Sequence, residues 1–268
     1  MDVKQVNLVY FSPTGSTETA VRLLGQAWGE LPAKETDLSV VPEAQRFGSS
    51  TLVIWGVPSF GGRVPDIAAE RFGRLRGDRT PCVLLTAYGN RDYDDTLLEM
   101  KDLAEEQGFL PVAAVAAVCE HSIARQYASG RPDARDRACL AEYGNAVRAA
   151  VTAWDGAAPN LKVKGNRPYK EKKGGPPMVP ATGKTCTGCM ACAKACPVQA
   201  ISYENVKKTD PKTCISCMRC VKVCPAGARK LPSMLLAAAG ARLKAVCAEP
   251  KPNALFLADV HGGMGARP

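Results

Sequence analysis

CTGCMACAKACP (residues 186–197) and CISCMRCVKVCP (residues 214–225) are two copies of one cysteine pattern, offset by 28 residues at every cysteine. Each copy has three cysteines at intervals of three residues, then a fourth cysteine four residues later that is followed directly by proline. Other residues recur at the same offset, among them Thr185/Thr213, Met190/Met218, Lys194/Lys222 and Ala200/Ala228. The segment is therefore an internal duplication, and it determines the fold of this part of the chain.

The chemistry of this spacing favours iron–sulfur clusters. Three thiolates two residues apart can hold corners of one 4Fe-4S cube, while a short helix carries the fourth cysteine to a neighbouring site. Zinc would favour paired Cys-x-x-Cys units that close a tetrahedron, and a disulfide framework conflicts with the reducing compartment that we expect below. Zinc and disulfides are thus the alternatives to two neighbouring clusters.

The duplicated segment closely resembles bacterial two-cluster ferredoxins, in which the fourth cysteine of each run binds the other cluster. The resemblance implies two 4Fe-4S clusters as cofactors. One would be bound by Cys186, Cys189, Cys192 and Cys224, and the other by Cys214, Cys217, Cys220 and Cys196. Basic residues near the runs, which would favour reduced clusters electrostatically, are Lys194, Arg219, Lys222, Arg229 and Lys230.

The net charge of +9 is unevenly distributed along the 268 residues. Residues 1–158 carry 16 Lys and Arg against 21 Asp and Glu, whereas residues 159–268 carry 19 against 5. Basic halves often bind nucleic acid, but the aromatic residues of this one are only Tyr169, Tyr203 and Phe256, which make no stacking platform. We expect a basic face that docks acidic redox proteins, such as a ferredoxin- or flavoprotein-type donor or acceptor, and no nucleic-acid partner.

Upstream of the cysteines, residues 156–180 are rich in Gly, Pro and Lys, which predicts a linker. The Pro176–Pro177 pair predicts a semi-extended chain, and the basic residues are expected to lie along the acidic first part. The cluster domain is then expected at 181–232. A C-terminal helix over 232–248 and an extended tail that packs onto one of the domains complete residues 233–268.

The first 155 residues alternate apolar strand-like runs with helix-period segments, which predicts an α/β domain. Strands are expected at 6–11, 34–40, 51–57, 81–88 and 112–119. Helices are expected at 17–29, 66–75, 94–107 and 134–154. Five strands alternating with helices suit a doubly wound parallel sheet, whose ligand crevice lies at the carboxyl ends of the strands.

SPTGST (residues 12–17) joins the first strand to the first helix and is a candidate phosphate loop. Hydroxyls and a glycine at a helix N-terminus offer several donors to a phosphate. The loop is not Gly-x-Gly-x-x-Gly and has no phosphate-loop lysine, so a dinucleotide or ATP is poorly supported. The candidates are Ser12, Thr14, Gly15, Ser16 and Thr17, and a hydroxyl-rich helix cap is the alternative.

Two further loops follow the third and fourth strands, VPSFGGRVP (57–65) and AYGNRDYD (87–94). An aromatic residue among glycines at the end of a strand is well placed to lie against a flat ring. The candidate contacts are Pro58, Phe60, Gly61, Gly62, Tyr88, Gly89, Asn90 and Tyr93. Together the three loops predict a planar phosphorylated ligand. For His121, after the fifth strand, a hydrogen-bonded loop histidine is favoured over a ligand contact.

These three loops resemble those of flavodoxins. The resemblance implies non-covalent FMN, with its phosphate at residues 12–17 and its isoalloxazine between Phe60 and Tyr93, and the strand order 2-1-3-4-5. Flavodoxins are usually strongly acidic, whereas this half is only mildly so.

The whole chain resembles the anaerobe fusions of a flavodoxin-like domain with a two-cluster ferredoxin, sometimes called ferrodoxins. That implies a carrier relaying single electrons between two clusters and FMN, rather than a stand-alone enzyme. The alternatives are a flavin-dependent reductase of a small substrate and a docking module without FMN. With no secretory leader and no apolar run of about 20 residues, we expect a cytoplasmic protein without a membrane span.

Overall fold

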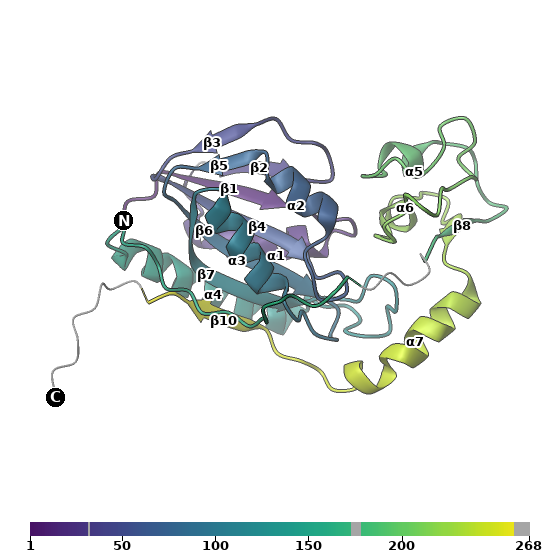
Figure 1. The fold of residues 1–268 in the computed structure, drawn as a ribbon. Coiled ribbons are helices and arrows are strands. Elements are labelled where there is room, and N and C mark those ends of the chain that lie inside the picture. Colours follow the sequence, from purple (N-terminus) through teal and green to yellow (C-terminus); the bar gives the residue numbers. More distant parts are fainter. Residues whose placement is uncertain (32, 173–177, 260–268) are drawn as a thin grey trace.

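The computed structural model describes residues 1–31, 33–172 and 178–259. Its largest feature is a six-stranded sheet in the order β10-β7-β6-β4-β1-β2 (Figure 1). The strands are β1 (Gln5–Tyr10), β2 (Ala33–Asp37), β4 (Thr51–Pro58), β6 (Thr80–Tyr88), β7 (Phe109–Val118) and β10 (Ala254–Leu257). The five strands from β1 to β7 are parallel, in the predicted order 2-1-3-4-5. The predicted fold class is therefore confirmed.

The sixth strand corrects the prediction of a five-stranded sheet. β10 comes from the expected C-terminal tail and pairs antiparallel with β7, with Ala254 opposite Ala116 and Leu257 opposite Ala113. The tail therefore packs onto the sheet by main-chain pairing. Its four residues are too few for a periodic signal, which is why the sequence did not reveal the partner strand.

Helices cover both faces of the sheet and explain why its central strands are apolar throughout. α1 (Ser16–Gly25), its extension η1 (Gln26–Trp28) and α4 (Ala134–Ala153) pack on one face, and α2 (Asp66–Phe72) and α3 (Thr96–Glu106) on the other. In β4, Leu52 and Ile54 pack in the core beneath α1 and α4, whereas Val53 and Trp55 pack in the core beneath α2 and α3. A strand buried on both faces is expected in a doubly wound parallel sheet.

A small second sheet was not predicted. β3 (Gln45–Phe47) and β5 (Leu75–Gly77) form a parallel pair beside the main sheet. Leu75 had been expected to end a helix, but α2 stops at Phe72 and Gly73 follows it. Three-residue strands carry too little pattern to be recognised locally.

The cysteine segment, residues 181–232, repeats its backbone as well as its sequence. α5 (Ala191–Lys194) and α6 (Arg219–Lys222) are equivalent helices, and β8 (Ala181–Thr182) pairs with β9 (Arg229–Lys230). Left-handed backbone conformations recur at the 28-residue offset, at Gly188/Ser216, Met190/Met218 and Gln199/Gly227. Since Ser, Met and Gln rarely adopt positive φ, this recurrence shows that the two halves share one chain path.

The basic segment, residues 159–172, lies along the acidic sheet region as predicted. Four of its basic residues form ion pairs with the sheet region: Lys164 with Asp92, Arg167 with Asp102, Lys170 with Asp94, and Lys172 with Asp66 and Glu99. Asp95 also accepts hydrogen bonds from the backbone amides of Asn166 and Lys170. The Pro176–Pro177 pair and residues 260–268 of the expected tail lie outside the described residues.

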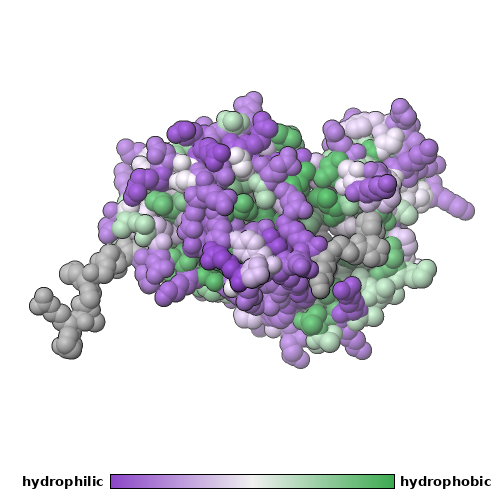
Figure 2. Space-filling model, in the orientation of Figure 1, coloured by the Kyte–Doolittle hydropathy of each residue, from purple (hydrophilic) through white to green (hydrophobic). Residues whose placement is uncertain are grey.

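The cysteine segment faces the end of the sheet at which the parallel strands terminate (Figure 1). From it, α7 (Ser233–Cys247) runs back toward the sheet region, with Met234 and Val246 exposed on its surface. Figure 2 shows hydrophilic side chains over most of the visible face of both parts, with hydrophobic colour along α7. Among the described residues, no helix combines the length and the apolar character needed to cross a bilayer.

Candidate functional site

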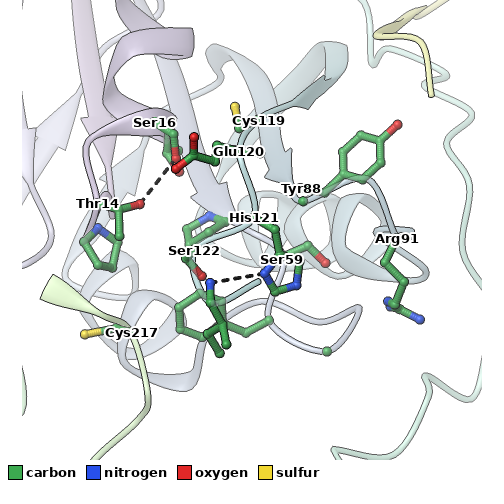
Figure 3. A pocket seen from close by; sticks show the side chains of 18 of the residues that line it. Thr14, Ser16, Ser59, Tyr88, Arg91, Cys119, Glu120, His121, Ser122 and Cys217 are labelled. Atoms are coloured by element: carbon green, nitrogen blue, oxygen red, sulfur yellow. Dashed lines mark hydrogen bonds between the residues drawn. The ribbon is translucent and has the colours of Figure 1, made fainter. Parts of the chain in front are cut away.

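A cavity of about 280 Å³ lies where the sheet region meets the cysteine segment. Residues from every predicted loop line it, together with a loop after β7, the cysteine segment and α7 (Figure 3). The lining residues used below are Thr14, Ser16, Thr17, Pro58, Phe60, Gly61, Tyr88, Gly89, Arg91, Asp92, Glu120, His121, Ser122, Ser216, Cys217 and Leu243. Its volume lies just below the usual range for ligand cavities, about 300–1,000 Å³.

The first loop supplies hydroxyls to the cavity, although not from every residue we expected. Thr14, Ser16 and Thr17 line it, and the Thr14 and Ser16 hydroxyl oxygens are 3.5 Å apart. Ser12 is buried, and its Oγ accepts a hydrogen bond from the Glu18 amide at 2.9 Å. Ser12 thus satisfies an amide in the first turn of α1, the helix-cap role that was the alternative at this loop.

Gly15 borders a second hollow that adjoins the first and shares Thr14 and Ser16 with it. At φ 91° it is the residue before α1, and glycine adopts this conformation without a Cβ clash. Cationic side chains line this hollow, namely Arg125, Arg131, Arg137 and Lys222. Lys222 comes from the cysteine segment, so the loop sequence alone could not reveal this positive charge.

Phe60 lies on the cavity wall within a tight turn. Its backbone exchanges hydrogen bonds with Arg63, and Gly61 and Gly62 occupy the two central positions at φ 62° and 92°. Positive φ at both positions requires the glycines. The Phe60 ring makes an edge contact with Phe11, 6.4 Å between centroids. Of the two glycines only Gly61 lines the cavity, since Gly62 is packed against the Asp94 side chain.

The third loop differs most from the prediction. Tyr93 is buried in the core against Tyr88, 5.2 Å between ring centroids, and does not line the cavity. Asn90 is also buried, and its side-chain amide donates to the carbonyls of Cys247 and Glu249. Tyr88 and Gly89 do line the cavity. The structure thus places Tyr93 and Asn90 in structural positions, while Arg91 and Asp92 face the site.

His121 is the residue that sequence reasoning undervalued. Its Nδ1 accepts the backbone amides of Ile123 and Ala124, at 3.2 and 3.1 Å, so in the neutral ring the proton is on Nε2 (Figure 3). Burial, and then the nearby Arg91, lowers the pKa of His121. It is thus both the hydrogen-bonded loop histidine that we favoured and part of the cavity wall, as a neutral N–H donor.

The first set of cysteines surrounds a small hollow. Cys186, Cys189, Cys192 and Cys224 all line it, although Cys224 is more than thirty residues from the other three in the sequence. The Ala228 amide donates to the Cys224 Sγ at 3.2 Å. Although burial raises the pKa of Cys224, backbone amides including that of Ala228 bring it below its ordinary value. Thiolates are the form that binds iron, so this site suits a cluster.

The second set is grouped in the same crossed manner. Cys196 and Cys220 pack against the same small core of buried side chains, although 24 residues separate them along the chain. Burial, reinforced by neighbouring thiols, raises the pKa of Cys217 to about 11 and that of Cys220 to about 12. The Ala200 amide donates to Cys196 Sγ at 3.3 Å, which repeats the Ala228–Cys224 bond. Soft cysteine sulfurs are the ligands that iron–sulfur clusters take, so the presence of four cysteines in this set fits a cluster.

The two sets differ in their surroundings. Cys189 of the first set is exposed. Cys217 of the second set is buried and lines the 280 Å³ cavity (Figure 3). Of the eight cysteines in the two sets, only Cys217 lines the cavity, so the second set is the nearer of the two to it.

Two arginines join the second set to the sheet region. Arg219 donates to the Ser12 carbonyl and the Ser39 hydroxyl and lies 3.6 Å from Asp37. Arg71 on α2 is buried and donates to the carbonyls of Leu38 and Pro197, at 2.7 and 2.6 Å. Since Pro197 directly follows Cys196, this contact fixes one cysteine of the set relative to the sheet.

The family comparison bears on the cysteine segment. Residues 185–228 match the family described as the 4Fe-4S dicluster domain. That match, with two groups of four cysteines, assigns the segment two 4Fe-4S clusters and gives the chain a role in redox electron transfer. No curated protein matches the chain.

Solved structures resemble the sheet region at low sequence identity. A flavodoxin from the domain Archaea is 12% identical, with 55% of this chain and 99% of that chain covered and a TM-score of 0.39. Flavodoxin 2 from Bacillus cereus is 12% identical, with 54% and 98% covered and a TM-score of 0.41. The Flv1 flavodiiron core from Synechocystis sp. PCC6803 is 15% identical, with 57% and 37% covered and a TM-score of 0.41. The chain thus spans little more than a third of the Flv1 core.

Proposed function

We propose that this protein is an electron carrier that relays single electrons between two 4Fe-4S clusters and an FMN bound in the 280 Å³ cavity. One observation carries the proposal: Cys217 belongs to the second cysteine set and also lines the cavity. A side chain common to both sites leaves little space between them. The clusters supply one-electron chemistry, and FMN, when bound, supplies both one- and two-electron chemistry.

The residues of the cavity fit FMN at both of its ends. Thr14, Ser16 and Thr17 would bind the phosphate from the start of α1, with the cations of the adjoining hollow nearby. Phe60 and Tyr88 would border the ring in place of the expected Phe60 and Tyr93 pair. His121 would hold its Nε2 proton toward a ring acceptor.

The exposure of the cysteines indicates which cluster an external redox partner can reach. Cys189 is exposed, so the first set is the side that an external donor or acceptor can approach. In the cysteine segment the acidic residues are only Glu204 and Asp210, whereas nine are basic. An acidic redox protein is therefore the class of partner that we propose for this face.

A carrier fits the cavity better than a reductase of a small substrate. Ser216 and Cys217 wall the cavity on one side, and Leu243 of α7 adds to the cover. A reductase would need open space for a substrate beside Phe60 and His121, and these residues border a volume of only about 280 Å³.

The test is cofactor analysis of protein purified without oxygen. We expect iron and sulfide for two 4Fe-4S clusters and one FMN per chain, with the flavin reduced after the clusters receive electrons one at a time. Clusters without flavin would leave only the docking-module alternative. Flavin without iron would rule out the relay. Steady turnover of a small organic acceptor, at a rate that competes with protein acceptors, would favour the reductase.

A further inference from the structure

Within the part of the chain that the structure describes, Arg229 is a buried cation without an anionic partner. Its side chain is 2% exposed, and the other basic residues near the cysteine runs are exposed or only half-buried. Nη1 donates to the Pro180 carbonyl at 3.2 Å and the Thr209 hydroxyl at 2.7 Å, and Nη2 donates to the Val206 carbonyl. All three acceptors are neutral. Nε has no partner among the described residues.

A buried guanidinium needs compensating negative charge nearby. No Asp or Glu forms an ion pair with Arg229 in the described part of the chain. The negative charge that is available belongs to the cysteine thiolates. Arg229 lines the hollow together with all four cysteines of the first set, and the amide of the preceding residue, Ala228, donates to Cys224 Sγ in that set.

The internal duplication shows that the fold does not require a cation here. Counting back 28 residues from Arg229 leads to Ile201, which is equally buried at 2%. The preceding residues, Ala228 and Ala200, play the same role in the two halves, since each donates its amide to a cysteine sulfur. One half therefore has an apolar side chain at this position, and the other has a fixed charge beside the first cysteine set.

We propose that Arg229 is the internal counter-charge of the 4Fe-4S cluster bound by the first set and raises its reduction potential. Reduction adds one electron, and hence one negative charge, to a cluster, with no bond made or broken in the protein. A buried positive charge stabilises that added charge more than a solvated surface lysine does, because little water screens it. Arg229 acts through the effect of its charge on the cluster and is therefore a positioning residue. The inference does not depend on FMN.

The test is an anaerobic redox titration followed by electron paramagnetic resonance, with iron content measured on each sample. Arg229→Met removes the charge at similar length, and Arg229→Ile copies the residue of the other half. We expect the reduction potential of the first set's cluster to fall by at least about 59 mV, which is a tenfold change in the reduction equilibrium of a one-electron couple. Lys230→Gln, at the exposed neighbouring residue, is the matched control and should shift that potential much less.

Each outcome decides the proposal. Full iron content with unchanged potentials in the neutral variants would overturn it, as would an equal shift in Lys230→Gln. If neither neutral variant assembles clusters, Arg229→Lys decides. Assembly of that variant with potentials near the wild-type values supports a requirement for charge, whereas failure to assemble shows that the hydrogen-bonding shape of arginine is what matters and overturns the proposal.

Discussion

Gly89 and His121 show how one residue pair shapes a wall of the cavity. A Cβ on Gly89 would lie 2.6 Å from His121 Cδ2, closer than real contacts allow. Only glycine at this position lets the loop after β6 approach the loop after β7. The orientation of the His121 ring, which presents Nε2–H, thus depends on the lack of a side chain at Gly89 as well as on the two amides that donate to Nδ1.

Gly89→Ala should weaken FMN binding because the new methyl group must displace the His121 ring. Overpacking of this kind costs about 1–3 kcal/mol, which is roughly a tenfold to hundredfold rise in Kd if the cost falls on the bound state. Titration of flavin-free protein with FMN, followed by fluorescence quenching, measures it. Gly48→Ala is the control, since its Cβ would meet nothing within 4 Å. Equal affinities for the two variants would contradict this account.

His121 should make stability depend on pH. Its pKa in the folded protein is lowered from 6.5, first by burial and then by Arg91, so the unfolded chain binds its proton at higher pH than the folded chain does. The stability that depends on neutral His121 is complete above pH 6.5 and declines as the pH falls from there toward the folded pKa.

Comparison of the wild type with His121→Gln isolates this effect, because all other titrating groups are shared. We expect the difference in Tm between the two proteins to narrow as the pH is lowered from about 8 to about 5. Ser122→Ala, which alters a neighbouring residue of the same loop, should track the wild type across the range. Parallel curves for wild type and His121→Gln would show that the ring does not titrate as described.

At the scale of elements, β10 is held by a residue that we expected to contact a ligand. The Asn90 side chain donates to the Cys247 and Glu249 carbonyls and accepts from the Lys251 amide, at 3.0, 2.9 and 2.9 Å. These three bonds position the chain between α7 and β10. The Asn253 side chain continues the contact by accepting the Val118 amide at the end of β7.

Asn90→Ala should therefore loosen β10 while leaving the cavity nearly intact. We expect the β10 amides to lose roughly tenfold to hundredfold of their protection in hydrogen exchange, with FMN affinity changed by less than about threefold. Asn205→Ala is the control, because Asn205 makes a local bond to the Lys207 amide in an exposed turn. A large loss of FMN affinity without a change in exchange would instead support the ligand contact that the sequence suggested.

Local sequence pattern and long-range packing account for different parts of the structure. The parallel strands follow from periodicity and the two cysteine runs from their spacing, which the chain carries within short windows, whereas the crossed sets were implied by the resemblance to two-cluster ferredoxins. The role of Asn90 depends on Cys247, 157 residues away. The same applies to Tyr93, which is buried against Tyr88 beneath Lys164 of the basic segment. Such positions depend on which distant segment arrives, and no local pattern records that.

For the whole molecule, Arg71 is central to how the halves meet. It is 6% exposed, lies on α2 and bonds the carbonyl of Pro197 next to Cys196. Its other contact is the Leu38 carbonyl, so it joins α2 and the chain after β2 to the cysteine segment. Burial lowers the pKa of Arg71 without changing its charge at neutral pH.

Arg71→Met should slow the passage of electrons between the second cysteine set and the cavity. Its loss leaves two buried carbonyls without their donor, at a cost of about 1–3 kcal/mol each, and the halves separate or shift to hydrate them. We expect a several-fold slower change in flavin absorbance after rapid one-electron reduction of the clusters, at unchanged iron and flavin content. Arg74→Met, at an exposed arginine nearby, should behave as wild type. An unchanged rate in Arg71→Met would refute this role.

The cysteine segment is held to the sheet region on both sides along the chain. Before it, residues 164–172 are ion-paired to the loops and helices of the sheet region, and after it, residues 251–257 join the sheet edge. A domain attached by one flexible linker meets its partner surface by diffusion, at a frequency that depends on the length and stiffness of the linker. A segment that is fixed on both sides keeps its position, so the distance that an electron must cross should be the same in every molecule and independent of protein concentration.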